Sequence, residues 1–237
     1  MKKYVLVLMI LGAVVCCKGR RAGASGEPGQ DADSIPTVAP DTAAAATGFA
    51  ALPEEPVFDI VTNMGTIKVK LYKDTPRHRA NFAKLAISGY YDSLLFHRVI
   101  SGFMIQGGDP FTRDTALVEL YGQGGPAYTV PMEMPLDAEG HVLHRHKKGA
   151  LCAARRSDVA NPFRESSGSQ FYLVQDPDHC VHLDSLYTVF GETVAGLNVI
   201  DRISEVKTDR YERPVRDVRI ITIKPDEELN SANGNQD

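Results

Sequence analysis

Residues 96–109 read FHRVISGFMIQGGD, and this stretch decides how the rest of the chain is interpreted. It places Arg98 and Gln106 among large apolar side chains and ends on two glycines and an aspartate. Large apolar groups are usually buried, whereas an arginine is almost never fully buried without a partner. The stretch therefore predicts that the Arg98 guanidinium lies beside an apolar surface and has a specific binding partner or a functional role. Three of its apolar residues are assigned to the core: Phe96, Val99 and Ile105.

The residues before this stretch predict a hairpin and a helix. Segments 57–62 and 66–72 alternate in hydrophobicity around a short loop that contains glycine, which is typical of a β-hairpin. Thr75 is a candidate N-cap, and proline and glycine stand at the expected start and end of a helix over 76–88.

The residues after it continue as short strand-like runs. A second helix is expected near 195–203 and a last strand over 217–223. Many short strands with two helices predict a mainly β architecture, either a barrel or a sandwich. The sequence contains no internal repeat.

The composition is that of an ordinary globular protein. The chain has 237 residues, of which 43% are hydrophobic and 24% charged, and its net charge is −4. A negative balance disfavours nucleic acid as a partner, because phosphate binding depends on clustered lysine and arginine.

The N-terminus has the pattern of a signal peptide over residues 1–17. Two lysines precede a 12-residue apolar run, which is too short for a membrane-spanning helix. The run ends at Cys16-Cys17 and resembles the lipidation box of bacterial lipoproteins, with Cys17 preferred to Cys16 as the lipidated residue. We therefore expect a lipid anchor in a bacterial membrane facing the periplasm; a soluble secreted protein is the alternative.

Two polar segments flank the expected domain. Residues 18–56 are rich in small and polar residues and predict a flexible linker, because such a segment cannot bury enough surface to offset the entropy of ordering. Residues 226–237 predict a disordered tail. The folded domain is expected over 57–225.

Several functional patterns are absent or weak. No GxSxG surrounds Ser169, which disfavours a nucleophile-elbow hydrolase. His141, His144 and His146 lack an evident fourth ligand, so a solvated loop is favoured over zinc binding, and a metal carrier stays a minor alternative. Cys152 and Cys180 could pair in an oxidising compartment, but free buried thiols are favoured.

Three separated motifs resemble the cyclophilin family of peptidyl-prolyl isomerases. They are FHRVISGFMIQGGD, SGSQFYLV (167–174) and HLDSLYTVFGE (182–192), and NF (81–82) and GYY (89–91) agree with them in the same order. The resemblance covers nearly all of 57–223. It implies a closed, eight-stranded antiparallel barrel capped by two α-helices, with the active groove on its outer face.

The resemblance also implies which residues form the site. Arg98 and Gln106 take catalytic positions. The substrate-binding positions are Phe103, Met104, Ala154, Arg155, Gln170, Tyr172, Leu183 and Tyr187. The expected partners are unfolded or flexible polypeptides that contain proline, and the expected state is a monomer.

The chemistry of these residue types suits prolyl isomerisation. An amide resists rotation by about 18–20 kcal/mol, and a twisted amide frees the prolyl nitrogen to accept a hydrogen bond. A permanently charged guanidinium can donate that bond, so neither a cofactor nor a metal is expected. The alternative is a non-catalytic proline-peptide-binding or chaperone module.

The chain departs from the family pattern at three places. His182 stands where many members have tryptophan, which predicts weak binding of cyclosporin. Tyr187 replaces a frequent histidine. The loop after Arg155 is longer than usual and is expected to change the recognition of residues that flank proline.

Overall fold

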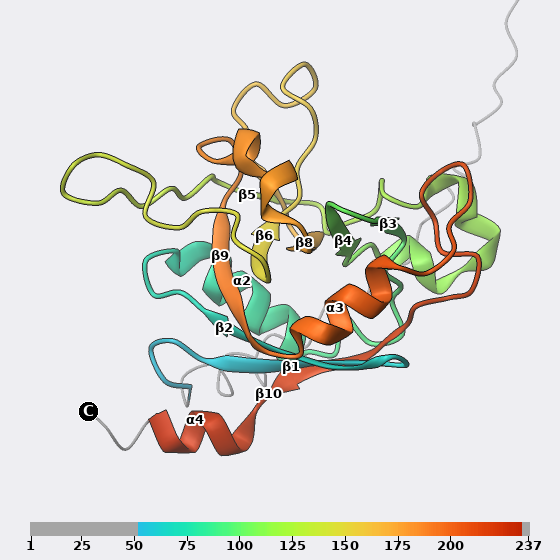
Figure 1. The fold of residues 1–237 in the computed structure, drawn as a ribbon, viewed down its shortest axis with the longest axis horizontal. Coiled ribbons are helices and arrows are strands. Elements are labelled where there is room, and N and C mark those ends of the chain that lie inside the picture. The colour runs from blue at the N-terminus through green and yellow to red at the C-terminus, as the bar shows by residue number, and fades with distance from the viewer. Residues whose placement is uncertain (1–51, 234–237) are drawn as a thin grey trace, which may run out of the picture. The chain divides into compact units, whose positions relative to one another are not determined.

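The computed structural model describes residues 52–233, and the main element in them is an antiparallel sheet of eight strands (Figure 1). In the order of pairing the strands are β10 (Ile220–Pro225), β1 (Val57–Thr62), β2 (Gly65–Leu71), β9 (Val189–Ala195), β6 (Ala150–Ala153), β8 (Phe171–Val174), β4 (Met104–Gly107) and β3 (Arg98–Ile100). A separate pair is formed by β5 (Thr129–Val130) and β7 (Ser166–Ser167).

The two edges of the large sheet meet just before β3 and β10. Leu95 and Arg219 form an isolated antiparallel bridge. The Phe96 amide donates to the Val218 carbonyl at 2.9 Å, and the Ile220 amide donates to the Leu94 carbonyl at 2.8 Å. The predicted mainly β fold, an eight-stranded antiparallel barrel, is confirmed.

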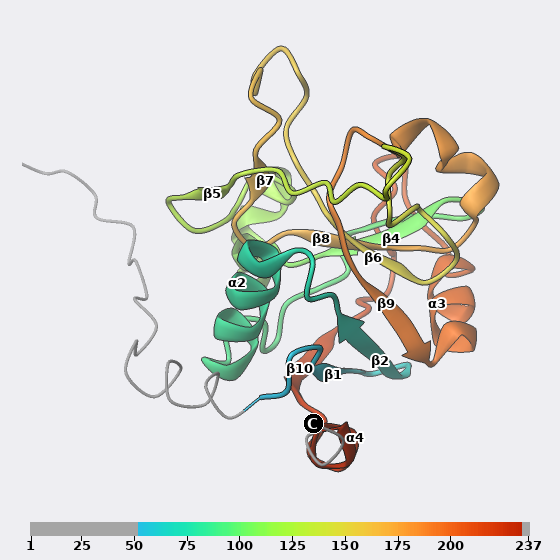
Figure 2. The same cartoon turned by 90° about the vertical axis from the view of Figure 1, so that its left-hand side faces the viewer.

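Two helices cover the barrel from opposite sides (Figure 2). They are α2 (Pro76–Ile87) and α3 (Leu197–Ser204), close to the predicted ranges. Four short 3-10 helices lie in the connections: η1 (Pro110–Arg113), η2 (Thr115–Leu120), η3 (Pro177–His179) and η4 (Val181–Leu183).

The start of α2 is capped by a distant carboxylate. Thr75 occupies the N-cap position but makes no side-chain cap bond. Glu133 instead accepts from the backbone amides of Arg77 and His78, at 3.0 and 2.9 Å, and from His78 Nδ1 at 2.6 Å. Thr75 is therefore at the predicted N-cap position, but Glu133, and not the Thr75 hydroxyl, accepts from the free amides.

The buried apolar side chains form two clusters. The larger one joins the sheet to α2 and α3, and it includes the three residues that the sequence assigned to the core: Phe96, Val99 and Ile105. The smaller cluster contains side chains from β4, β6, β8 and η4. The two clusters take alternate residues of β4, β6 and β8 and so lie on opposite faces of these strands. The smaller cluster therefore lies on the face away from the barrel core.

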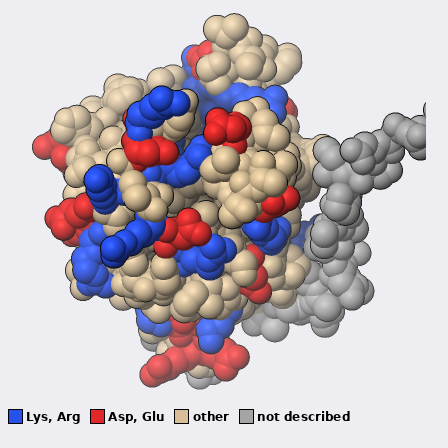
Figure 3. Space-filling view, turned by 90° about the vertical axis from the view of Figure 1, so that its right-hand side faces the viewer, with Lys and Arg blue, Asp and Glu red and all other residues tan. Residues whose placement is uncertain are grey.

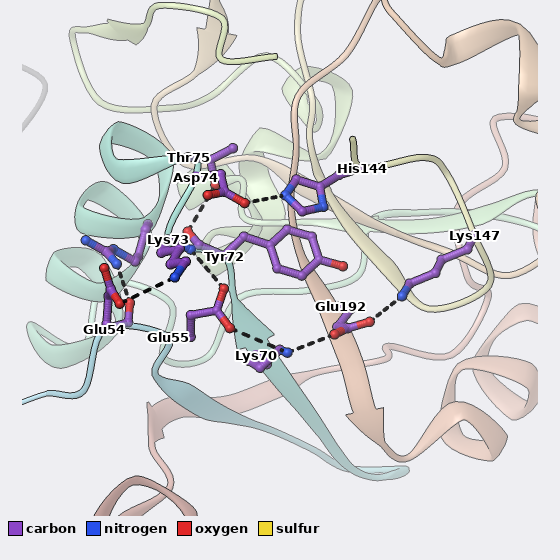
Figure 4. Close-up of polar contacts among 11 residues, drawn as sticks. Glu54, Glu55, Lys70, Tyr72, Lys73, Asp74, Thr75, His144, Lys147 and Glu192 are labelled. Carbon is purple, nitrogen blue, oxygen red and sulfur yellow. Dashed lines mark hydrogen bonds and ion pairs between the residues drawn. The ribbon is translucent and has the colours of Figure 1, made fainter. Parts of the chain in front are cut away.

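The segment that precedes β1 is packed from residue 52 onward, contrary to the expected linker boundary at residue 56. Leu52 packs against the larger cluster. Glu55 pairs with Lys70, which also bonds Glu192 at 3.1 Å, so the segment is tied to β2 and β9 (Figure 4). Residues 18–51, and with them the rest of the predicted linker, lie outside the described residues.

The predicted disordered tail is also wrong over residues 226–233. Residues Glu227–Asn233 form helix α4, whose start is held by Asp226 through the Leu229 amide at 2.9 Å and through Lys68. Asn230 bonds both backbone groups of Val57, at 2.8 and 2.9 Å. These partners outweigh the polar composition on which the prediction of disorder rested.

The predicted signal peptide and lipidation site, Cys16 and Cys17, lie outside the described residues. Within residues 52–233, no helix combines the length and the hydrophobicity that a membrane crossing requires.

Candidate active site

The candidate site begins with a row of residues that crosses four neighbouring strands. Strand pairing places Arg98 opposite Gln106, Gln106 opposite Tyr172, and Tyr172 opposite Cys152. Because successive side chains of a strand point to opposite faces, these four residues share one face of the sheet. The predicted catalytic pair and the predicted aromatic position are thus brought side by side.

The next row along the same strands belongs to the barrel core. Val99, Ile105 and Leu173 are paired in turn, and all three are in the larger apolar cluster. Strand β4 therefore supplies Ile105 to the core and Gln106 to the site from adjacent positions.

The apolar wall of the site is the smaller cluster. Met104, Tyr172 and Leu183 are buried in it. Phe103, Ala154 and Tyr187 are partly buried and pack against it. Six of the eight predicted substrate-binding residues thus gather in one apolar group next to the row that contains Arg98.

Tyr172 is held in the wall by a buried histidine. Its hydroxyl lies 2.8 Å from Nε2 of His146, whose Nδ1 lies 2.7 Å from an oxygen of Asp184. The His146 side chain is only 1% exposed, so the expected solvated loop is wrong for this residue. Burial lowers the pKa of His146, although the Asp184 carboxylate opposes the shift.

The two cysteines lie in the same cluster as free, buried thiols, as favoured from the sequence. Burial raises the pKa of Cys180 to about 11 and that of Cys152 well above its ordinary value. Neither thiol is therefore an activated nucleophile.

The two predicted glutamines are linked directly. Nε2 of Gln106 donates to Oε1 of Gln170 at 3.0 Å. Nε2 of Gln170 in turn donates to the carbonyls of Gly122 and Gly124, at 3.0 and 2.7 Å. This chain fixes the Gln106 side chain beside Arg98.

The end of the opening stretch supports this arrangement. Gly108 has a φ of +89°, and a Cβ there would lie 2.3 Å from the Ser169 carbonyl oxygen. The buried carboxylate of Asp109 accepts from the amides of Phe111 and Gly122. The glycine thus lets the end of β4 approach the segment before β8 that contains Gln170, and the aspartate holds the loop that Gln170 contacts.

Arg98 has a carboxylate partner that the sequence did not reveal. Its Nε donates to Glu212 at 2.6 Å, and the two side chains are 43% and 45% exposed. The backbone carbonyl of Glu212 also accepts from the Val99 amide at 2.8 Å. The contact engages Nε alone, and Nη1 and Nη2 have no hydrogen-bond acceptor among residues 52–233.

Arg155 and Tyr187 form the far edge of the site. The Arg155 guanidinium lies 4.3 Å from the centre of the Tyr187 ring and donates to the Leu186 carbonyl at 3.0 Å. The Arg155 side chain is only 4% exposed, so it supports the wall rather than presenting a free charge. His182 is exposed at the neighbouring 3-10 helix η4.

A cavity of about 610 Å³ adjoins the apolar wall. The site contributes Gln106, Ala154, Arg155 and Gln170 to its lining, and the remaining lining residues come from segments 122–129, 156–165 and 167–168. The most buried wall residues, Met104 and Tyr172, are not part of this lining. The cavity is therefore a neighbouring recess rather than the proline slot itself.

The histidines considered for metal binding have separate carboxylate partners. His141 pairs with Asp137, and His144 bonds Asp74 while it stacks on Tyr72 (Figure 4). In the part of the chain that the structure describes, no group of three or more histidine, cysteine or acidic residues is placed to bind a metal ion.

The charges on one face of the molecule are mixed in sign (Figure 3). Basic and acidic side chains are interspersed there, and the view shows no large area of a single sign. This face therefore lacks the extended basic surface on which phosphate-backbone binding depends.

The polar row beside an apolar wall, on the outside of an eight-stranded antiparallel barrel, is the arrangement of a cyclophilin-like protein. Comparison with known families gives the same result: the model for cyclophilin type peptidyl-prolyl cis-trans isomerases matches residues 57–225. The chain belongs to the cyclophilin-type peptidyl-prolyl cis-trans isomerase family, and the predicted enzyme class is confirmed.

Individual relatives agree with this assignment. Peptidyl-prolyl cis-trans isomerase CYP18-2 of Arabidopsis thaliana is 35% identical over 171 residues, which cover 71% of this chain and 93% of the relative. Peptidyl-prolyl cis-trans isomerase-like 2 of Rhizopus delemar is 35% identical over 166 residues, but the match spans only 28% of that longer protein.

A solved structure is also similar to this chain. It is a cyclophilin type isomerase of Cryptosporidium parvum in the presence of the dipeptide Ala-Pro, with a TM-score of 0.60 and 27% identity. The match covers 72% of this chain and 99% of the solved one.

Proposed function

We propose that this chain accelerates rotation about X–Pro bonds in flexible polypeptides, with Arg98 stabilising the twisted amide. The observation that carries the proposal is the strand register that places Arg98 and Gln106 beside Tyr172 and the apolar wall. A proline ring against this wall would have its nitrogen and the preceding carbonyl near the guanidinium.

The ion pair with Glu212 leaves Arg98 able to act. An arginine offers five N–H donors, and the carboxylate uses only Nε. The two Nη groups can donate to the prolyl nitrogen as it loses its resonance with the carbonyl. Gln106, fixed by Gln170, would orient the adjoining peptide group.

The required stabilisation is within reach of such groups. Lowering the rotation barrier by about 7 kcal/mol gives roughly 10⁵-fold acceleration. The removal of one preorganised donor from a catalytic site typically costs about 10²–10³-fold in rate. Arg98 could therefore supply a large share, and the apolar wall would supply the rest by holding the ring while the carbonyl turns.

The proposed substrates are unfolded or flexible segments that contain proline. The similarity to an isomerase solved in the presence of Ala-Pro supports this class. The wall is open at the surface through Phe103, Ala154 and Tyr187, which are only partly buried.

The proposed location is the bacterial cell envelope, with the chain attached to the membrane by a lipid on Cys17 or Cys16. The support is the basic start, the short apolar run and the cysteine pair at its end. Mass spectrometry of the mature protein tests this, because a lipidated N-terminal cysteine is expected and Cys17→Ser should remove it. A mature N-terminus without lipid would favour the soluble secreted alternative.

The catalytic proposal is tested with the full chain and a short X–Pro peptide. Arg98→Ala should lower kcat/KM for cis–trans exchange by about 100-fold or more. Arg219→Ala is the matched control, because Arg219 is similarly exposed and is also paired with a carboxylate, Asp217. Equal activity of the two variants would contradict the role of Arg98.

One observation favours the non-catalytic alternative, namely that Arg98 already has a carboxylate partner. NMR titration with a proline peptide distinguishes the two functions. Exchange cross-peaks between the cis and trans forms are expected for an isomerase, and binding without exchange is expected for a module that only holds the peptide.

A further inference from the structure

The loop over residues 156–165 turns its two large apolar side chains outward. Val159 is 97% exposed and Phe163 is 82% exposed. The loop leaves the body of the protein and forms the top of the views in Figures 1 and 2. Single exposed apolar residues are common, so the arrangement of the whole loop decides their meaning.

The polar side chains of this loop are used within it. Asp158 binds Arg155 at 2.5 Å and Arg164 at 3.0 Å. The Asn161 side chain bonds both the carbonyl and the amide of Glu165, at 2.8 and 3.1 Å. These bonds between its own polar groups hold the loop in shape, while its two large apolar side chains remain in water.

The backbone next to Phe163 is strained. Arg164 has a φ of +54°, in the left-handed region that residues other than glycine rarely adopt. Such conformations persist where the surrounding contacts hold them, and they concentrate at functional sites. Here the bonds from Arg164 to Asp158 provide those contacts.

The loop is continuous with the candidate active site. Ala160, Asn161 and Glu165 line the same cavity as Gln106, Ala154 and Gln170. A polypeptide that leaves the proline slot through this cavity therefore meets the loop next. Glu165 also accepts from Thr129 at 2.7 Å, which ties the loop to the opposite wall of the cavity.

We propose that the 156–165 loop is a holding surface for apolar side chains of an unfolded polypeptide that flank the proline being isomerised. The inference rests on the proposed function and extends it from short peptides to protein substrates. Burial of a phenylalanine side chain contributes roughly tenfold or more to affinity. Val159 and Phe163 therefore raise the affinity for unfolded chains and leave the chemistry at Arg98 unchanged.

The charges of the loop favour a polypeptide over a lipid surface. Surfaces that bind anionic lipids combine apolar groups with free lysine and arginine. Arg155 and Arg164 are paired with Asp158, so Arg156 is the one arginine of segment 155–165 without a carboxylate partner among residues 52–233. Uncharged apolar side chains beside a substrate cavity fit an extended, uncharged chain better.

The test compares two substrates on the full chain. One is a short X–Pro tetrapeptide, and the other is a reduced, carboxymethylated ribonuclease whose refolding is limited by proline isomerisation. The double variant Val159→Ser with Phe163→Ser should lose about tenfold in kcat/KM on the ribonuclease and stay within twofold on the tetrapeptide. Val194→Ser with Ile221→Ser is the matched control, since these residues are exposed on β9 and β10.

Two results on these substrates would overturn the inference: equal kcat/KM of the variant and the unsubstituted chain on the ribonuclease, and an equal loss of kcat/KM on both substrates. It would also be overturned if the double variant kept its kcat/KM on the ribonuclease and lost only its binding to anionic vesicles, measured by sedimentation, or its self-association. Inertness of the unsubstituted chain on the tetrapeptide would instead contradict the proposed function. The loop is then judged by its affinity for the unfolded ribonuclease, which should fall about tenfold in the double variant.

Discussion

Arg98 and Glu212 form a half-exposed ion pair. The Glu212 carboxylate can affect Arg98 in two ways, by attracting its charge and by fixing the orientation of its guanidinium. Exposed pairs of this kind contribute about 0–1 kcal/mol, because water screens the attraction. The attraction to Glu212 therefore weakens only slightly the ability of the guanidinium to bind another acceptor. The fixed direction of the Nε bond is the larger effect, because it restricts the orientation of the planar guanidinium and so of its Nη groups.

We predict that Glu212→Ala lowers kcat/KM on a tetrapeptide about three- to fivefold, because the guanidinium loses its orientation. Glu212→Gln keeps an oxygen acceptor for Nε and should stay within twofold of the unsubstituted chain. Steady-state exchange measurements by NMR check both variants. A faster Glu212→Ala variant would show instead that the carboxylate competes with the substrate for Arg98.

His97, beside Arg98 in the sequence, makes stability depend on pH. Loss of solvation in the buried site lowers the pKa of His97 to about 4 from 6.5; Arg98 and Arg213 add to the shift, and Asp109 opposes it. Between these values the unfolded chain binds a proton that the folded chain does not. The free energy of unfolding therefore falls as the pH falls from about 6.5 towards 4.

The expected slope from this residue is at most about 1.4 kcal/mol per pH unit. His97→Phe should have a shallower pH dependence than the unsubstituted chain over the same window. Urea unfolding at several pH values between 4 and 7 measures both. Parallel curves for the two proteins would mean that His97 does not titrate as its burial implies.

At the scale of secondary structure, the sequence correctly predicted the strands and helices whose limits are set by neighbouring residues. Strand β1 and helices α2 and α3 lie within a few residues of their predicted ranges, because alternation, proline and glycine act over short distances. The cap of α2 was missed, because Glu133 is 55 residues away from His78 in the sequence and no local pattern links them.

In the candidate site, too, local patterns indicated some residues and missed the contacts between distant segments. Strand alternation and the family motifs indicated Arg98, Gln106 and Tyr172, and the structure brings them together. Glu212 and the His146–Asp184 pair were missed, since Glu212 and His146 lie in charged runs that are typical of solvated loops and the motif that contains Asp184 does not reveal its partner. Only the three-dimensional arrangement places those loops against the wall.

The distant cap gives a prediction for helix α2. Glu133→Ala removes three hydrogen bonds to the start of the helix and should lower the free energy of unfolding by about 1.5–3 kcal/mol. Thr75→Val should cost less, about 1 kcal/mol, because the buried hydroxyl does not cap the helix and makes only a long bond of 3.3 Å to the Tyr72 carbonyl. Urea unfolding curves distinguish the two, and a reversed order would contradict the assignment of the cap.

At the scale of the whole described domain, its two ends are joined. Asn230 of α4 bonds the amide and the carbonyl of Val57 at the start of β1, and Asp226 bonds Lys68 of β2. A segment that reads as a polar tail thus fastens the first strand. The start of β1 thus gains partners that the neighbouring strands β10 and β2 do not provide.

We predict that Asn230→Ala lowers the free energy of unfolding by about 1–3 kcal/mol, because it leaves the buried amide of Val57 without its partner, whereas the Val57 carbonyl still accepts from the Asp226 amide. Ser231→Ala is the control, since Ser231 lies on the exposed side of α4 and should change stability by less than about 0.5 kcal/mol. Thermal and urea unfolding measure both variants. Equal free energies of unfolding for the two variants would show that the Asn230 bonds to Val57 do not stabilise the fold.

Strands β3, β4 and β8 supply alternate residues to two different tasks. Arg98, Gln106 and Tyr172 lie on the face of the candidate site, while Val99, Ile105 and Leu173 fill the barrel. Selection for new substrates can therefore act on every second position and leave the others untouched. Such a sheet can acquire a new specificity through single substitutions, each of which leaves the packing that keeps the barrel folded intact.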